Sequence, residues 1–212
     1  MNARLAALLL ASFLFLAGCV VQSIRPFATA ASRVPMPEGI AGEWLLASEH
    51  GDAREGYAPW TFAEDRLDLI DQHGNRAYLE TTFFRLDKHL FLDSVPGSPD
   101  DDRTNRFWNW HIAPMHLPCR VELAGDILTL LPLDANWLNK LADAEGGPSY
   151  ILPDETEKDW RIYTASPEEW EAFLRQHAAN PEAFPAKLAI VLRRAAPPPP
   201  PPLPLPGENP GE

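Results

Sequence analysis

Short apolar runs separated by turn signals fill the chain from residue 38 to residue 194, and this pattern restricts the fold more than any other feature. The runs 120–123 and 127–133 flank Ala-Gly-Asp, which is typical of a hairpin connection. Val121 and Leu123 alternate with charged neighbours, as in a strand with one face in water. The pattern predicts an all-β-dominated fold of about eight to ten short strands in an antiparallel β-barrel, with a two-sheet sandwich as the alternative.

Two segments instead have the spacing of amphipathic helices. Ser166 is followed by Pro167 and Glu169, which matches a capping box with proline at the first helical position. The apolar stripe after this cap consists of Trp170, Phe173, Leu174 and His177. The segment 134–144 begins with an aspartate cap and has a similar stripe. We expect both helices to cover the outside of the sheet, because 127–131 is apolar on almost all of both faces.

The amino terminus carries a second strong signal. Arg4 and the terminal amine supply positive charge, and residues 5–16 then form an uninterrupted run without a charge. That run is too short to cross a hydrocarbon core, which needs about 20 helical residues, so it is typical of a secretory signal. It ends in the sequence Leu16-Ala17-Gly18-Cys19.

This ending resembles the lipobox of bacterial lipoproteins, in which an aliphatic residue and two small residues precede a cysteine. The resemblance implies that the signal is cut after Gly18 and that Cys19 is acylated, so that the lipid bilayer is a partner of the chain. Val20, rather than aspartate, after the cysteine implies the outer membrane and its periplasmic face. An ordinary signal peptide with an incidental Cys19 is the alternative. If Cys19 carries lipid, Cys119 has no partner within the chain and is expected to be a buried, inert thiol.

The composition divides the chain into four parts. Residues 1–18 form the signal peptide, 19–37 a flexible tether that begins with the lipidated cysteine, 38–194 the barrel domain and 195–212 a disordered tail. The tail contains six consecutive prolines, which favour a polyproline II rod. A solvated tail is the favoured interpretation, and docking of the tail to another envelope protein is the alternative.

Gly42-Glu43-Trp44 opens the first strand of the predicted barrel and resembles the Gly-x-Trp signature of lipocalins and related calycin barrels. Those barrels place an arginine near the end of the last strand, packed over this tryptophan at the closed end. Arg193 and Arg194 end the last predicted strand here. The resemblance therefore implies a lipocalin-like barrel in which a cation–π contact worth about 0.5–2 kcal/mol ties the last strand to the first.

No arrangement of residues in the sequence indicates catalysis or a cofactor. The 18 basic and 30 acidic residues give a net charge of −12, which argues against nucleic-acid binding. His111, His116 and Cys119 are the best metal-like set, but no fourth ligand accompanies them, and Pro114 and Pro118 exclude a regular helix there. We therefore expect no enzyme activity, no metal and no cofactor.

The aromatic residues point to a binding function instead. Seven tryptophans are many for one domain, and strand alternation alone does not separate a packed core from an aromatic-lined pocket. The first hypothesis is that the barrel binds a small apolar or lipid-like ligand. The second is a non-enzymatic envelope interaction or assembly protein with a filled core, which acts through its surface. The candidate wall residues of the pocket are Trp60, Phe84, Trp108 and Trp110.

Overall fold

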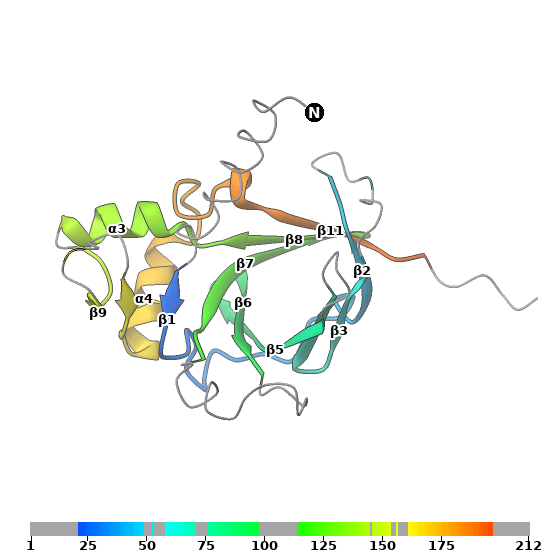
Figure 1. Cartoon of the computed structure of the whole chain (residues 1–212), viewed down its shortest axis with the longest axis horizontal. Coiled ribbons are helices and arrows are strands. Elements are labelled where there is room, and N and C mark those ends of the chain that lie inside the picture. Colours follow the sequence, from blue (N-terminus) through cyan, green and yellow to red (C-terminus); the bar gives the residue numbers. More distant parts are fainter. Residues whose placement is uncertain are drawn as a thin grey trace, which may run out of the picture.

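The computed structural model describes residues 21–48, 52, 58–70, 76–97, 114–144, 146–153, 156 and 161–196. Eight strands within this part form a closed barrel in which all neighbours are antiparallel (Figure 1). The predicted barrel is thus confirmed, and the sandwich is excluded. In order around the barrel, the strands are β2 (Gly42–Leu46), β3 (Trp60–Ala63), β4 (Arg66–Ile70), β5 (Arg76–Leu86), β6 (His89–Pro96), β7 (Leu117–Ala124), β8 (Ile127–Pro132) and β11 (Ile190–Arg194).

The two ends of the barrel are built differently. At one end, tight turns connect β3 to β4, β5 to β6 and β7 to β8, and the backbone is left-handed at Glu64, Asp87 and Gly125. The segment before β2 also crosses this end, which we call the closed end. At the other end, β2, β4, β6 and β8 are each followed by a longer connection. We call this the open end.

Alternating side chains of the barrel strands fill the interior. Trp44, Phe62, Leu128 and Leu192 point inward from four different strands and are almost fully buried. These side chains form one apolar cluster inside the barrel, and it reaches the closed end.

Two helices form a second layer outside the barrel, and both lie on the same side of it (Figure 1). α3 (Ala135–Asp143) and α4 (Pro167–His177) confirm both predicted helices, since Asp134 and Ser166 each accept hydrogen bonds from first-turn backbone N–H groups. The outer apolar cluster joins these helices to side chains that point away from the barrel interior, among them Phe84. The molecule therefore has two apolar clusters, one on each face of the barrel sheet.

A small sheet stands beside the helices. Its strands are β1 (Gln22–Ser23), β10 (Ile162–Tyr163) and β9 (Tyr150–Ile151), in that order, with β1 parallel and β9 antiparallel to β10. A short 3-10 helix, η1 (Ala186–Leu188), leads from the helical layer back to β11.

The segment predicted as a flexible tether, 19–37, is part of the fold from residue 21 onward. Val21 and Phe27 are buried in the outer apolar cluster. The backbone N–H of Val34 donates to the carbonyl of Phe83 on β5, at 2.9 Å. The tether prediction is therefore corrected for this stretch. An irregular segment has no periodicity to show that its apolar side chains fit between strands and helices.

Both termini of the chain lie beyond the described residues. These parts include Gly18 and Cys19 at the amino end and the proline run of the tail. Among the residues that are described, no helix combines the length and the hydropathy needed to cross a membrane.

Candidate functional site

Trp44 and Arg194 seal the closed end of the barrel. Trp44 is fully buried, and its indole Nε1 donates a hydrogen bond to the carbonyl of Ile40 at 2.7 Å. The Arg194 guanidinium lies over the indole, with Cζ 4.4 Å from the ring centroid. The same guanidinium donates to the carbonyls of Gly39 and Ala41. The expected arginine–tryptophan contact is thus present, and it joins the last strand to the segment before the first.

The other two residues of this signature lie close by. Gly42 has a φ of 115°, a conformation that favours glycine at the start of β2. Arg193 lies opposite Leu45 on β2 and Ile127 on β8, and it is exposed. Of the two adjacent arginines, only Arg194 therefore lies over the tryptophan.

Arg194→Ala is expected to lower the free energy of unfolding by about 1–2 kcal/mol, because it removes the cation–π contact and the charged donors to two carbonyls. The matched variant Arg193→Ala loses only an exposed guanidinium, and its expected change is below about 0.5 kcal/mol. Urea unfolding followed by circular dichroism measures both values. Equal losses in the two variants would contradict this account of the closed end.

The inward-facing side chains become more exposed toward the open end. Along β5, Ala77 is exposed and Leu79 is half-buried, whereas Thr81 is 5% and Phe83 is 3% exposed. Along β5 the interior is therefore packed in the middle and at the closed end, and solvent reaches apolar side chains at the open end. Other half-buried, inward-facing residues near this end are Leu46, Leu69, Cys119 and Ile190. On β6 and β7, two inward-facing side chains near the closed end are also accessible, since Leu90 is half-buried and Leu123 is 38% exposed.

Thr81, Ser94 and Cys119 add uncharged polar groups to this apolar lining. The buried Thr81 hydroxyl has no hydrogen-bond partner in the described part of the chain. Ser94 lies opposite Thr81 on β6, and its hydroxyl donates to the Leu117 carbonyl at 3.4 Å. Burial, and secondarily the Asp93 carboxylate, raises the pKa of the Cys119 thiol to about 12. The thiol is therefore protonated at neutral pH and is not a nucleophile.

The structure separates the four predicted wall residues. Trp60 is half-buried and faces the interior, directly opposite Trp44. Phe84 is fully buried in the outer cluster and stacks on Phe91, with 5.2 Å between the ring centroids, so it is not placed to touch a ligand inside the barrel. The neighbouring Phe83 takes the inward position instead. The remaining two predicted wall residues, which lie outside the described residues, are Trp108 and Trp110.

The aliphatic residues of the open end are absent from the predicted wall, which is entirely aromatic. Strand alternation does predict that these residues face inward. Leu46 lies two residues after Trp44, and Leu69 lies two residues after Leu67, so each shares a face with a core residue of its strand. The sequence does not show which strand ends lie at the open end. That depends on how the strands close into a barrel.

The metal-like set of two histidines and a cysteine does not converge in the described part. His116 and Cys119 are three residues apart on extended chain and so point to opposite faces of the sheet. His116 faces outward, where its Nδ1 lies 2.9 Å from Oδ2 of the buried Asp93, and His111 is not among the described residues. The same Asp93 oxygen accepts a hydrogen bond from the Phe27 N–H at 3.2 Å, so this pair fixes the amino-terminal segment. Among the residues described, no group of three His, Cys, Asp or Glu side chains is arranged to hold a metal ion.

A shallow groove of about 360 Å³ lies near the closed end, between the segment before β2, the turn from β3 to β4 and the edge of β5. Arg33, Glu64 and Asp65 give it exposed charges of both signs. Such a lining stays hydrated and suits an apolar ligand poorly. We therefore place the candidate site at the open end of the barrel. The groove is lined by Arg33, Val34, Pro35, Met36, Glu64, Asp65, Thr81, Thr82 and Phe83.

Comparisons of the chain with models of protein families, with curated proteins and with solved structures find no match. The function of the chain is therefore inferred from its sequence, its fold and the geometry of the open end.

Proposed function

We propose that this chain is a lipoprotein, anchored through an acylated Cys19, whose barrel binds a small apolar or lipid-like molecule at its open end. The observation that carries the proposal is the rise in exposure of the inward-facing side chains from Phe83 through Leu79 to Ala77. A barrel that is sealed at one end and accessible through apolar side chains at the other suits a ligand entering from one direction. Val20 after the cysteine supports placement at the outer membrane, facing the periplasm.

The lining favours an apolar ligand over a charged one. Burial of its apolar surface gains about 25 cal/mol per Å². A chain-like ligand that covers about 300 Å² would gain roughly 7 kcal/mol before the cost of association. An ionised group at the same depth would lose its hydration, and the hydroxyls of Thr81 and Ser94 would replace only part of it. The function supported best is therefore binding of an apolar ligand.

Leu79→Gln is expected to weaken binding of the apolar probe N-phenylnaphthylamine by about tenfold, because an amide replaces methyl groups at the open end. Titration of the probe fluorescence against protein measures the change, and displacement by a fatty acid identifies the class of competitor. The matched control is Leu123→Gln, since Leu123 is 38% exposed and lies near the last residue of β7, at the closed end. We expect the control to bind as the unaltered protein does. Unchanged binding by Leu79→Gln would contradict a ligand site at the open end.

Cys19→Ser is expected to abolish incorporation of a labelled acyl chain, because the thiol that accepts the chain is removed. Cys119→Ser is the matched control and should retain full labelling, since the Cys119 thiol faces the barrel interior. Metabolic labelling with a palmitate analogue, followed by gel fluorography, measures both variants. Acylation that persists in Cys19→Ser would show that the anchor is elsewhere.

A further inference from the structure

The small sheet presents three isoleucines and one glutamine on the face that points away from the helices. Ser23 and Tyr163 point from its inner face toward the helices and are buried. Side chains alternate along a strand, so Gln22, Ile24 and Ile162 lie on the other face, where Ile162 lies between Gln22 on β1 and Ile151 on β9. Ile24 is 45% exposed and Ile151 is 52% exposed, and Ile162 between the two flanking strands is half-buried. We call these three residues the isoleucine patch.

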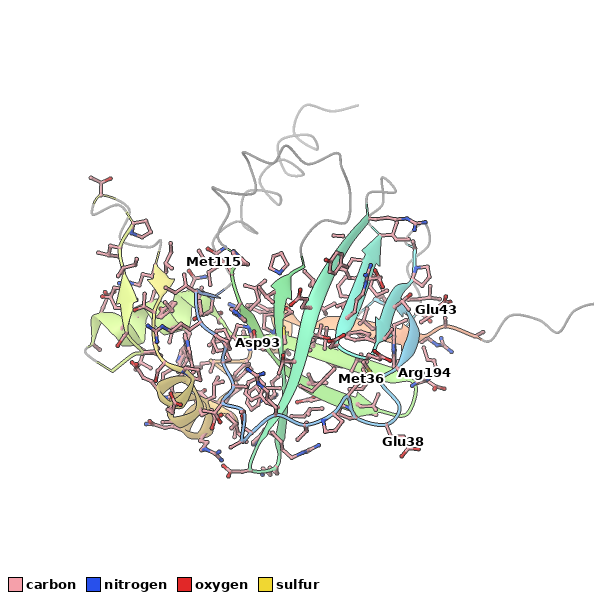
Figure 2. All side chains as sticks on the ribbon, turned by 90° about the horizontal axis from the view of Figure 1, so that it is seen from below. Met36, Glu38, Glu43, Asp93, Met115 and Arg194 are labelled. Atoms are coloured by element: carbon pink, nitrogen blue, oxygen red, sulfur yellow. The ribbon has the colours of Figure 1, made fainter. Side chains whose placement is uncertain are left out.

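The isoleucine patch adjoins the open end of the barrel. Ser23 forms an antiparallel bridge with His116, with two N–H to carbonyl bonds of 3.1 and 2.8 Å. His116 directly precedes β7, which begins at the open end, and by alternation Met115 lies on the same side of this bridge as Ile24. Figure 2 shows Met115 well separated from Arg194, which marks the closed end. The patch and the open end therefore belong to the same end of the molecule.

Very little chain separates the proposed anchor from the small sheet. Val20 and Val21 alone lie between Cys19 and β1, and Val21 is already buried. A residue extends the chain by at most about 3.6 Å, so the Cα of Cys19 lies within roughly 7 Å of the Cα of Val21. Acyl chains on Cys19 enter the bilayer. The head groups of that bilayer must therefore lie against this edge of the domain.

The isoleucine patch is exposed, adjoins the open end and is separated from Cys19 by very few residues. We therefore infer that the isoleucine patch lies against the bilayer and that the open end of the barrel faces the membrane. The occupant of the patch is the phospholipid bilayer that holds the anchor, so the inference rests on the proposed acylation of Cys19. Burial of the isoleucine side chains at the membrane–water interface adds to the free energy of membrane binding that the acyl chains provide. A lipid-like ligand would then enter the barrel from the bilayer rather than from the aqueous phase.

A fluorescent nitrobenzoxadiazole label attached at Ile151→Cys tests this orientation in the full-length, acylated protein. A label at Leu123→Cys, at the closed end, is the matched control, and a Cys119→Ser background restricts labelling to the introduced thiol. The proteins are reconstituted into vesicles of phosphatidylethanolamine and phosphatidylcholine. These lipids carry no net charge and do not repel the acidic residues of the β9–β10 connection, which are Asp154, Glu155, Glu157 and Asp159.

The label at position 151 is expected to shift its emission to the blue, to be quenched by nitroxide-bearing lipid and to lose its quenching by iodide. The label at position 123 should remain open to iodide. Equal iodide quenching at both positions in acylated, vesicle-bound protein would overturn the orientation and leave the anchor standing. Protein that carries no acyl mass and stays off the vesicles would overturn both. A blue shift at position 151 that follows protein concentration in detergent would assign the patch to a second copy and overturn the bilayer as its occupant.

Discussion

Trp44→Ala is expected to lower the free energy of unfolding by about 3–5 kcal/mol, as for other fully buried large aromatic side chains. The indole fills the closed end, where neighbouring strands and the segment before β2 meet around it. Its removal leaves a cavity, deprives the Ile40 carbonyl of its donor and takes away the ring beneath Arg194. Urea unfolding followed by far-ultraviolet circular dichroism measures the loss.

Trp60→Ala provides the matched comparison, because Trp60 lies directly opposite Trp44 on β3 but is only half-buried. Less apolar surface is removed from the folded state, and the expected loss is about 1–2 kcal/mol. A loss at Trp60 as large as that at Trp44 would contradict the difference in burial between these two tryptophans.

Trp170→Ala, in the outer apolar cluster, is also expected to lower the free energy of unfolding by about 3–5 kcal/mol. Trp170 is fully buried in the outer cluster, with its ring centroid 4.4 Å from that of Phe27 and 5.4 Å from that of Tyr163. Its Nε1 donates to the Ser23 hydroxyl at 3.2 Å. One side chain thus holds α4 to the amino-terminal segment and to the small sheet.

Hydrogen exchange locates the effect of this substitution. In Trp170→Ala, we expect the amides of β1 and β10 to lose protection before those in the middle of the barrel strands. Trp170→Phe keeps most of the aromatic packing and removes the donor to Ser23, so its expected loss is about 1–2 kcal/mol. Uniform loss of protection throughout the barrel would show that the helical layer and the barrel unfold as one unit.

The sequence contains enough information for the barrel and for both helices. Hairpin signals such as Ala-Gly-Asp at the turn from β7 to β8 are local, and so is the cap that Ser166 forms at the start of α4. Local rules decide these features because turn conformation and capping depend on residues close together in the chain. The Gly-x-Trp signature likewise leads to the closed end, where Trp44 and Arg194 meet.

The features that the sequence does not predict are those in which a segment is covered by other elements on both of its faces. Phe83 and Phe84 are adjacent and equally apolar, and both faces of β5 are covered here, so periodicity does not show which one points inward. The amino-terminal segment poses the same difficulty. Phe27 is buried because α4 and β6 create a place for it, and none of those contacts is local in sequence.

The proposed membrane-facing orientation would allow the open end to take up its ligand directly from the bilayer. The anchor and the isoleucine patch would hold the barrel where lipid-like molecules are concentrated. A ligand would then exchange between bilayer and barrel without crossing water, where exposure of its apolar surface is costly. The aliphatic lining at Leu46, Leu69 and Leu79 fits that environment better than an aqueous one.

Native mass spectrometry of residues 20–212, incubated with phospholipid vesicles and then separated from them, tests most directly whether the barrel holds an apolar ligand. This form omits Cys19, so any added lipid mass is held without a covalent bond. We expect extra mass that disappears on denaturation and that is reduced in Leu79→Gln but retained in Leu123→Gln. The bare mass of the chain after the same incubation would contradict a ligand site in the barrel.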